Sequence, residues 1–431
     1  MRRSATSNPS TPRPATAGRA IPTLRPHAGR KLPRALQPEH VGSLAGALPD
    51  GVADPAFEEL LARIDESVFR PARRIDVYFE GEKAFDAMIA DVEAASTEVL
   101  LESYILKGDE TGRRFQRVLI AAAGRGVRVR VLADALGSFS TRSVFWSELR
   151  QAGIETRLYH PLGVPLRFLK YRDHRKILVV DGRVAYTGGM NIGNEYGSSL
   201  LPSEGVFRDT HARVEGQTAW EAAIVFREGW LRAGGSAMPL EPLAPAASPG
   251  PRVMVLNSRP GRGARETAAT FAAIVGAARR RLWITVAYFA PRRRVLRILG
   301  GAARRGVDVR LLLPGRSDVR LVRHCGHGFF SSLLSRGVRL FEYQPSILHA
   351  KTFVADGSAS VIGSSNLDFR SFERNAECNF AILDETVGRT MERQFEKDLA
   401  ASVEILQPDW KRRGWLHCTG DAAARRLAPL L

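Results

Sequence analysis

The fold of this chain is indicated most clearly by two stretches, HRKILVVDGRVAYTGGMN at residues 174–191 and HAKTFVADGSASVIGSSN at residues 349–366. Both follow the pattern H-x-K-x4-D-x6-G-x2-N, with every fixed position filled. One H-x-K-x4-D could arise by chance in a chain of 431 residues, whereas the complete pattern twice is a strong signal. The chain is therefore predicted to contain two copies of one unit.

The sequence around these stretches repeats as well. RVLIAAAGRGVRVRVLAD at 117–134 aligns without gaps on RILGGAARRGVDVRLLLP at 297–314, and each predicts a helix that ends near Gly126 or Gly306, followed by an apolar strand. Alternating helices and apolar strands are typical of α/β architecture with largely buried sheets. We therefore predict a pseudo-dimer of two duplicated α/β domains. Each would be a mixed β-sheet flanked by helices, with both motifs in one shared active site.

Composition marks the boundaries of the two copies. Residues 1–50 hold eight of the 24 prolines and eight Lys or Arg against two acids, and we expect them to form a disordered basic arm. Residues 234–251 are too rich in proline and glycine for a helix or a central strand, so we expect a linker there. The predicted domains are then 51–233 and 252–408, with a C-terminal tail at 409–431.

The chain is strongly basic, with 63 Lys and Arg against 45 Asp and Glu and a formal net charge of +18. This balance indicates a polyanionic partner, such as nucleic acid or anionic lipid, and does not choose between them. An apolar content of 44% excludes disorder of the whole chain, and three scattered cysteines exclude a disulfide scaffold. The sequence holds no run of about 18 apolar residues, so we expect no transmembrane helix.

The residue types of the two motifs suit chemistry on a phosphodiester. In an extended strand the His and Lys of H-x-K point to the same face, and the apolar residues around them predict that this face is buried. Unpaired burial costs roughly 2–7 kcal/mol per polar group, so these side chains need a functional reason. A neutral imidazole can act as nucleophile or as acid and base, while Lys and Asn supply positive charge and N–H donors for a phosphoryl group.

The two motifs resemble the HKD signature of the phospholipase D superfamily, and both match it completely. Flanking stretches such as LESYI, DETGRRF, FRDTHARVEG and LHAKTFVADGSASVIGSSNLDFRS are most similar to bacterial cardiolipin synthases, and the resemblance covers residues 76–405. It implies two phospholipase D-like domains and a phosphatidyltransferase that makes cardiolipin from phosphatidylglycerol through a phosphohistidine intermediate. It implies no metal and no other cofactor.

The resemblance also implies the roles of the motif residues. His174 is expected to attack phosphorus and His349 to act as general acid and base, and the reverse assignment stays open because the motifs are nearly symmetrical. The other residues of the expected catalytic set are Lys176, Asp181, Lys351 and Asp356. The substrate phosphate would be held by Lys176, Asn191, Lys351 and Asn366.

Acids near the motifs are expected to have supporting roles. Asp181 and Asp356 fall on the opposite side of the strand from His and Lys, so we expect them to stabilise the local fold. NAECNFAI aligns with RDTHARV, which superposes Glu377 on Asp209. In the superfamily an acid at this position accepts a hydrogen bond from the motif histidine, and the resemblance gives that histidine-orienting role to Asp209 and Glu377.

Two other histidine patterns are less specific. His211, close to Asp209, is as consistent with a core histidine as with a site residue. His324, Cys325 and His327 form an H-C-G-H pattern, but no fourth ligand is evident nearby, so we predict no metal site.

Other functions stay open at this point. A phospholipase D that hydrolyses phospholipids to phosphatidic acid would carry the same motifs, because the choice of water or lipid alcohol as acceptor depends on the closed cleft. An HKD nuclease would suit the basic charge, but we find no nucleic-acid-binding module and expect no nucleic-acid partner. A non-enzymatic membrane-surface adaptor is a third alternative. The expected partners are an anionic phospholipid membrane and phosphatidylglycerol, for a monomer peripherally bound at the cytoplasmic face of the cell membrane.

Overall fold

The computed structural model describes most of the chain, namely residues 44, 46–65, 67–161, 170–197, 205–239, 250–259, 266–426 and 428. Most of the expected basic arm (1–43), the middle of the expected linker (240–249) and the last residues of the expected tail lie outside these described residues. None of the described helices has both the length and the apolar character needed to cross a bilayer.

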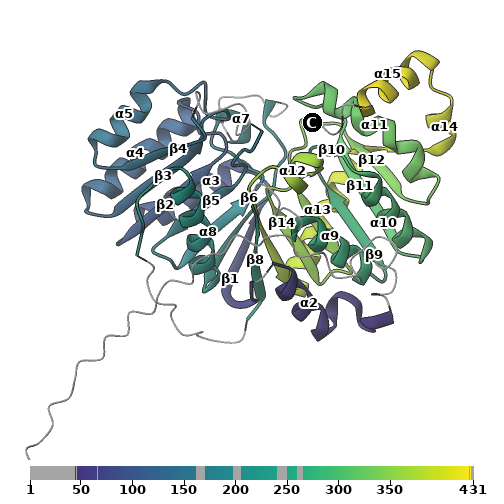
Figure 1. Ribbon diagram of the computed structural model, residues 1–431, viewed down its shortest axis with the longest axis horizontal. Coiled ribbons are helices and arrows are strands. Elements are labelled where there is room, and N and C mark those ends of the chain that lie inside the picture. Colours follow the sequence, from purple (N-terminus) through teal and green to yellow (C-terminus); the bar gives the residue numbers. More distant parts are fainter. Residues whose placement is uncertain are drawn as a thin grey trace, which may run out of the picture.

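One mixed sheet of 15 strands runs through both halves of the molecule (Figure 1). From the centre outward, the strands of the first half are β1 (Arg70–Tyr78), β7 (His211–Gly216), β6 (Val184–Gly188), β5 (Lys176–Val180), β2 (Glu98–Ser103), β3 (Arg128–Asp134) and β4 (Glu155–Tyr159). Those of the second half are β8 (Arg252–Ser258), β16 (Glu377–Leu383), β14 (Ala359–Gly363), β13 (Thr352–Ala355), β9 (Arg281–Thr285), β11 (Asp308–Pro314), β12 (Arg339–Tyr343) and β17 (Ser402–Ile405). Apart from β17, the two halves have the same order, which confirms the predicted duplication.

The two halves are joined at their first strands and packed together along their middle strands. β1 pairs antiparallel with β8 through Arg70↔Val253 and Pro71↔Arg252. Across the junction β6 lies against β14 and β16. Their apolar side chains share one core, which includes Ala185, Val214, Ile362 and Phe380. The predicted pseudo-dimer is therefore present, with its two sheets connected into one.

Helices flank the sheet in both halves (Figure 1). Those of the first half are α3 (Gly81–Glu93), α4 (Glu110–Gly124), α5 (Ser143–Gln151), α7 (Asn194–Gly197) and α8 (Thr218–Arg232). Those of the second half are α9 (Glu266–Ala277), α10 (Arg293–Arg304), α11 (Arg320–Leu334), α12 (Phe369–Glu373) and α13 (Glu385–Ala400), with a short pair of strands, β10 (Phe289–Ala290) and β15 (Leu367–Asp368). In α4, Phe115, Leu119 and Ala122 recur every three or four residues and are buried, as an amphipathic helix requires.

Two equivalent glycines end the helices that the sequence repeat predicts. Gly126 follows α4 with φ +89° and Gly306 follows α10 with φ +90°. In this left-handed region a side chain is strained, so glycine closes the helix and lets the chain turn into β3 or β11.

Both ends of the described chain pack on the second half. The amino-terminal elements are η2 (Gly51–Ala53) and α2 (Pro55–Asp65), and Phe57 and Leu61 of α2 share a core with Phe271 and Ile274 of α9. Although α2 lies within the first predicted domain by sequence, it belongs to the second by packing. The expected tail is also folded, into α14 (Gln407–Lys411) and α15 (Trp415–Arg426), and α15 packs on α11.

Candidate active site

Both motif histidines lie just before a strand, where the chain contacts the opposite half. β5 begins at Lys176 and β13 at Thr352, so the histidines precede these strands rather than lying inside them. The backbone N–H of His174 donates to the carbonyl of Ala376 at 2.9 Å, and that of His349 donates to the carbonyl of Arg208 at 2.7 Å. Each histidine is therefore tied to the other half, and both lie at the junction.

His174 is held by a buried carboxylate. Its Nδ1 lies 3.0 Å from Oε2 of Glu377, and both side chains are buried. Glu377 also accepts hydrogen bonds from the hydroxyls of Ser364, at 2.5 Å, and Ser371, at 2.9 Å. With Nδ1 donating to the acid, Nε2 carries the lone pair that a nucleophile needs.

His349 has the same kind of partner and a more aromatic environment. Its Nδ1 lies 2.7 Å from Oδ2 of Asp209, whose other oxygen accepts the backbone N–H of Thr210 at 2.7 Å. Three rings surround the imidazole at centroid distances of 5.3, 5.9 and 6.1 Å, those of Tyr196, Phe207 and Tyr288.

The two acids are exchanged between the halves. Glu377 of the second half binds His174 of the first, and Asp209 of the first half binds His349 of the second. The sequence alignment placed the acids at equivalent positions but left open which histidine each one serves. Because each dyad needs both halves, the site exists only when the halves are packed together.

The two lysines are buried against the histidine segments. Nζ of Lys176 donates to the carbonyl of His174 at 2.6 Å and lies over the ring of Tyr104. Nζ of Lys351 lies 2.8 and 3.1 Å from the two ring nitrogens of His349. Burial lowers the pKa of Lys176 to about 7 and that of Lys351 to about 8. A bound phosphodiester would raise both values, because a nearby anion favours the charged form of lysine.

Both histidines are neutral at pH 7 in this arrangement. Burial lowers the pKa of His174 to about 4 against the opposing charge of Glu377, and burial also lowers the pKa of His349. The positive charge of Lys351 contributes to the lowered pKa of His174, so the second motif acts electrostatically on the first. An anionic substrate would raise the pKa of either histidine and allow one of them to carry a proton.

The motif asparagines brace the segments that follow β2 and β9. Oδ1 of Asn191 accepts the backbone N–H of Ile105 at 3.1 Å, and Oδ1 of Asn366 accepts that of Tyr288 at 3.1 Å. Nδ2 of Asn191 donates to the hydroxyl of Tyr196 at 2.7 Å. The first asparagine therefore already uses the amide that was expected to hold a phosphoryl oxygen.

The motif aspartates lie at the far ends of their strands. Asp181 and Asp356 have φ of +52° and +54° in the turns that follow β5 and β13. Each carboxylate accepts three successive backbone N–H groups at 2.8–3.0 Å, those of Ser96, Thr97 and Glu98 and those of Arg279, Arg280 and Arg281. Burial opposes ionisation of Asp181, but these hydrogen bonds outweigh it and lower its pKa to about 2. Both aspartates hold a strand junction and do not reach the histidines.

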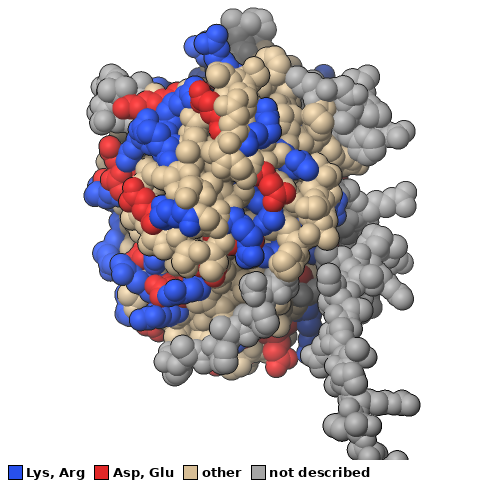
Figure 2. Space-filling view, turned by 90° about the vertical axis from the view of Figure 1, so that its left-hand side faces the viewer, with Lys and Arg blue, Asp and Glu red and all other residues tan. Residues whose placement is uncertain are grey.

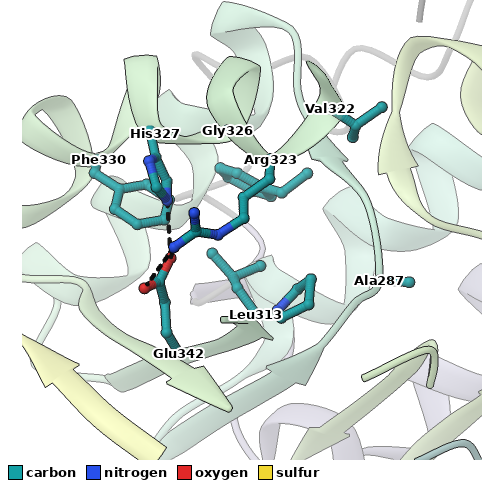
Figure 3. Close-up of a pocket in the computed structure, with 10 residues that line it drawn as sticks. Ala287, Leu313, Val322, Arg323, Gly326, His327, Phe330 and Glu342 are labelled. Atoms are coloured by element: carbon teal, nitrogen blue, oxygen red, sulfur yellow. Dashed lines mark hydrogen bonds and ion pairs between the residues drawn. The ribbon is translucent and has the colours of Figure 1, made fainter. Parts of the chain in front are cut away.

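The H-C-G-H pattern lies on α11, apart from the two motifs, beside the pocket shown in Figure 3. Nε2 of His327 lies 2.8 Å from Glu342, which also accepts from Arg323 at 3.0 Å. Nδ1 of His324 lies 3.1 Å from Asp421 of α15. The sequence spacing could not reveal Asp421, which forms a possible ligand group with the two histidines.

Arginines already pair with both carboxylates that contact these histidines, those of Asp421 and Glu342. Arg413 binds Asp421 at 2.7 Å and Arg323 binds Glu342, so the carboxylates have positive partners without a metal. We interpret the cluster as a hydrogen-bonded contact between α11 and α15.

His211 is a fully buried residue of β7. Neither ring nitrogen has a hydrogen-bond partner among the described residues, and burial lowers its pKa to about 4. Its ring packs near Tyr186, with centroids 6.5 Å apart. These contacts are those of a core histidine.

Sequence reasoning missed the rings and hydroxyls around the two histidines. Tyr104 packs on His174 with centroids 5.0 Å apart, and its position in LESYI, directly after a predicted strand, could have indicated it. Tyr196 lies in NEY shortly after the first motif, and Ser364 lies inside the second. None of these residues repeats at the equivalent position of the other half, so the repeat itself did not mark them.

One family model and several proteins of known family match this chain. The family model described as "Cardiolipin synthase, PLD-like domain" matches residues 88–199 and 272–399, and each matched segment contains one HKD motif. A cardiolipin synthase of Clostridium perfringens (strain SM101) is 32% identical over 378 residues, which cover 85% of this chain and 79% of that protein. A cardiolipin synthase of Geobacillus kaustophilus is 33% identical over 381 residues, covering 86% of this chain and 75% of that protein.

Among solved structures, the chain is similar to the phosphatidylserine synthase of Haemophilus influenzae Rd KW20. The TM-score is 0.66 with 13% sequence identity, and the match covers 87% of this chain and 98% of that chain. At this identity the similarity concerns the fold, and it supports the duplicated arrangement described above.

Proposed function

This chain belongs to the cardiolipin synthase family with phospholipase D-like domains, and we propose that it is a phosphatidyltransferase that joins two phosphatidylglycerol molecules into cardiolipin and glycerol. The observation that carries this proposal is the pair of buried His–carboxylate dyads, each built from both halves. Two such groups at one junction suit a double displacement at phosphorus, in which one imidazole attacks and the other moves a proton.

In the first step, Nε2 of His174 attacks the phosphorus of phosphatidylglycerol. The bond from phosphorus to the headgroup glycerol oxygen breaks, and the protonated imidazole of His349 gives its proton to that oxygen. Glycerol leaves, and the phosphatidyl group remains on His174. Lys176 and Lys351 hold the phosphoryl oxygens, where charge develops in the transition state.

In the second step, the now neutral His349 takes the proton from a headgroup hydroxyl of a second phosphatidylglycerol. The hydroxyl oxygen attacks phosphorus, the bond to His174 breaks, and cardiolipin leaves with His349 protonated again. The contact of His349 with Asp209 is 2.7 Å, against 3.0 Å for His174 with Glu377. A carboxylate partner stabilises the charged form of either imidazole, so both dyads suit a proton carrier, and we propose His349 for this role with the reverse assignment as the alternative.

The membrane setting follows from the substrate. An enzyme of this family acts on phospholipid, and we propose that this chain works as a peripheral protein at the cytoplasmic face of the cell membrane. We propose a monomer, because one chain supplies both histidines and both acids.

The test uses purified full-length protein and vesicles of phosphatidylglycerol. We expect cardiolipin and glycerol in equal amounts from the wild type, and at least about 100-fold less of both products from His174→Ala or His349→Ala. His324→Ala is the matched control, because this histidine lies on α11 outside the site, and it should keep full activity. Phosphatidic acid as the main product would make the chain a hydrolase, and phosphodiester cleavage of DNA without lipid turnover would make it a nuclease.

A further inference from the structure

The exposed apolar side chains are concentrated in two equivalent loops. Ten large apolar side chains are exposed among the described residues, and five of them lie in residues 135–144 and 315–321. Each of these segments is a loop with the first residues of the helix that follows it, α5 or α11, and we call them the rim loops. The exposed fractions are 49% for Leu136, 70% for Phe139, 46% for Val144, 39% for Val319 and 42% for Leu321. The first rim loop follows β3 and the second follows β11, its counterpart in the other half.

Both rim loops lie at the end of the sheet that carries the histidines. β5 runs antiparallel to β2, with Lys176 opposite Ser103, and β2 runs parallel to β3. The carboxyl end of β3 therefore lies at the same end of the sheet as His174. The pairing of β13, β9 and β11 repeats this arrangement for the second motif.

Each rim loop also contacts an aromatic residue that packs on a motif histidine. Oγ of Ser138 donates to the carbonyl of Tyr104 at 3.2 Å, and Tyr104 packs on His174. In the other half the hydroxyl of Tyr288 donates to Asp318 at 2.7 Å, and Tyr288 packs on His349. The two loops thus flank the shared site from opposite halves.

The first rim loop is fixed, although its apolar side chains face solvent. The backbone N–H groups of Leu136 and Gly137 donate to Oδ1 of Asp134 at 2.9 and 3.1 Å, and Ser138 donates to the backbone of Asp134 at 2.9 Å. These hydrogen bonds hold the backbone that leads into Phe139, whose side chain is exposed. Exposed apolar groups in a fixed loop indicate a surface that is covered by a partner.

The charges in the rim loops favour an anionic partner. Arg142, Arg316 and Arg320 are exposed, and among the described residues no carboxylate forms an ion pair with them, whereas Asp318 accepts a hydrogen bond from the hydroxyl of Tyr288. The two signs of charge are mixed on the end of the molecule formed by the first half. Figure 2 shows Lys and Arg side chains lying between Asp and Glu side chains over the end of the molecule formed by the first half.

We propose that the rim loops dock the enzyme on an anionic phospholipid bilayer, with their apolar side chains in the acyl boundary and their arginines at the headgroups. This inference rests on the proposed function, because a lipid substrate must reach the histidines from a membrane. Apolar insertion next to unpaired arginines is the chemistry by which peripheral proteins hold such surfaces. Contact on both sides of the site would also cover it against water, which favours transfer over hydrolysis.

The test compares two triple variants of the full-length protein. The rim variant is Leu136→Ser, Phe139→Ser and Val319→Ser. The control variant is Val68→Ser, Leu231→Ser and Leu406→Ser, at residues that are exposed by 45%, 50% and 51% and lie outside the rim loops. Binding is measured by co-sedimentation with vesicles of equal parts phosphatidylglycerol and phosphatidylcholine. Turnover is measured on these vesicles and on a phosphatidylglycerol whose acyl chains are short enough to keep it monomeric.

We expect the rim variant to bind vesicles at least about tenfold more weakly and to lose vesicle turnover in proportion, while turnover of the monomeric lipid stays unchanged. The control variant should match the wild type in all three measurements. Equal vesicle binding by the rim variant and the wild type, or an equal loss in the control variant, would overturn the proposal. So would a loss of monomeric-lipid turnover in the rim variant. A wild type that is dimeric in analytical ultracentrifugation while the rim variant is monomeric would also overturn it, because the rim loops would then cover a second copy of the chain.

The same experiment separates this inference from the proposed function. A wild type that binds vesicles through the rim loops, yet converts neither form of phosphatidylglycerol, would refute the proposed reaction and still support the docking surface.

Discussion

The two copies of the motif hold the same histidine and lysine in different surroundings. The first copy reads RDHRK at 172–176, and Arg172 binds Asp134 through Nε and Nη2 at 2.8–3.1 Å, with both side chains buried. The second copy reads ILHAK at 347–351, and Pro314 stands at the position of the acid. Buried ion pairs position the first histidine segment, whereas apolar packing positions the second.

The middle residue of H-x-K shows the same contrast. Arg175 is fully buried, with Nη2 donating to Asn257 at 2.6 Å and Nη1 lying 3.6 Å from Glu102. The equivalent positions in the second copy are Ala350 and Thr285. Both copies keep a histidine, a lysine and a carboxylate that binds the histidine, whereas the buried side chains behind them differ.

The largest expected effect separates the chemical roles of the two equivalent histidines. His174→Ala should lower kcat for cardiolipin formation by at least about 10⁴-fold, because no nucleophile remains. His349→Ala should lower kcat by about 10²–10⁴-fold, because it removes acid and base catalysis alone. With a phosphatidyl substrate whose leaving group needs no proton, His349→Ala should accumulate a covalent adduct on His174, detected by intact-protein mass spectrometry at neutral pH. An adduct in His174→Ala instead would exchange the two roles.

The second prediction concerns the exchanged acids. Asp209→Asn and Glu377→Gln should each lower kcat by about 10²–10⁴-fold, because each orients a histidine and stabilises its charged form. Loss of Asp209 also lowers the pKa of His349, which must be protonated in the first step. The high-pH limit of activity should therefore move to lower pH. Loss of Glu377 lowers the pKa of His174, which must be neutral to attack, so activity should persist to lower pH. Profiles of kcat against pH for both variants check this. The two shifts interchanged would contradict either the pairing of acids with histidines or the proposed roles of the histidines, and identical shifts would contradict the different roles.

The third prediction converts the first copy into the second. Arg175→Ala alone should lower the free energy of unfolding by about 3–5 kcal/mol, because it leaves buried partners unpaired. Burial and the charge of Asp173 raise the pKa of Glu102. Without Arg175, this buried acid would therefore contribute little to the stability of the fold. Adding Glu102→Thr should therefore recover part of the loss in urea denaturation. A double variant less stable than Arg175→Ala would show that Glu102 has another stabilising role.

The smallest expected effect concerns His211, whose counterpart in the second half is Asn379. Oδ1 of Asn379 accepts the backbone N–H of Ser365 at 3.1 Å, whereas His211 has no hydrogen-bond partner among the described residues. The pKa of His211 is about 4 in the folded chain and about 6.5 when unfolded. The unfolded chain therefore binds more protons in this window, and the free energy of unfolding falls as pH drops from about 6.5 towards 4.

Between pH 7 and pH 4.5, His211→Asn should lose about 1–3 kcal/mol less free energy of unfolding than the wild type. His174 contributes with the same sign, so part of the fall remains in the variant. Urea denaturation of wild type and variant between pH 4.5 and pH 7 checks the difference. Parallel curves would contradict an unpaired neutral histidine in the core.

Most positions of the candidate site could be found in the sequence because they repeat. His174 and His349, with their lysines, stand out by spacing alone, and alignment of the two halves found Asp209 and Glu377. The residues that sequence analysis missed do not repeat. Tyr196 packs on His349 from the first half and has no counterpart that the alignment could mark.

The structure altered the expectation for the asparagines and for the domain boundary. Asn191 was expected to hold a phosphoryl oxygen, but its amide donates to Tyr196. The helix α2 was assigned to the first domain by its place in the chain, and it packs on the second. Neither contact follows from local pattern, because both depend on which surfaces meet after the halves are folded.

The residue pattern was sufficient for the duplication, the α/β class and the two histidine motifs, because periodicity and repeated spacing act within short segments of chain. The exchange of the two acids, the single sheet and the clustering of exposed apolar loops beside the site appear only in three dimensions. They join residues such as His174 and Glu377, which are 203 positions apart in the chain. Contacts over such separations depend on how the two halves pack, and no local sequence rule encodes that packing.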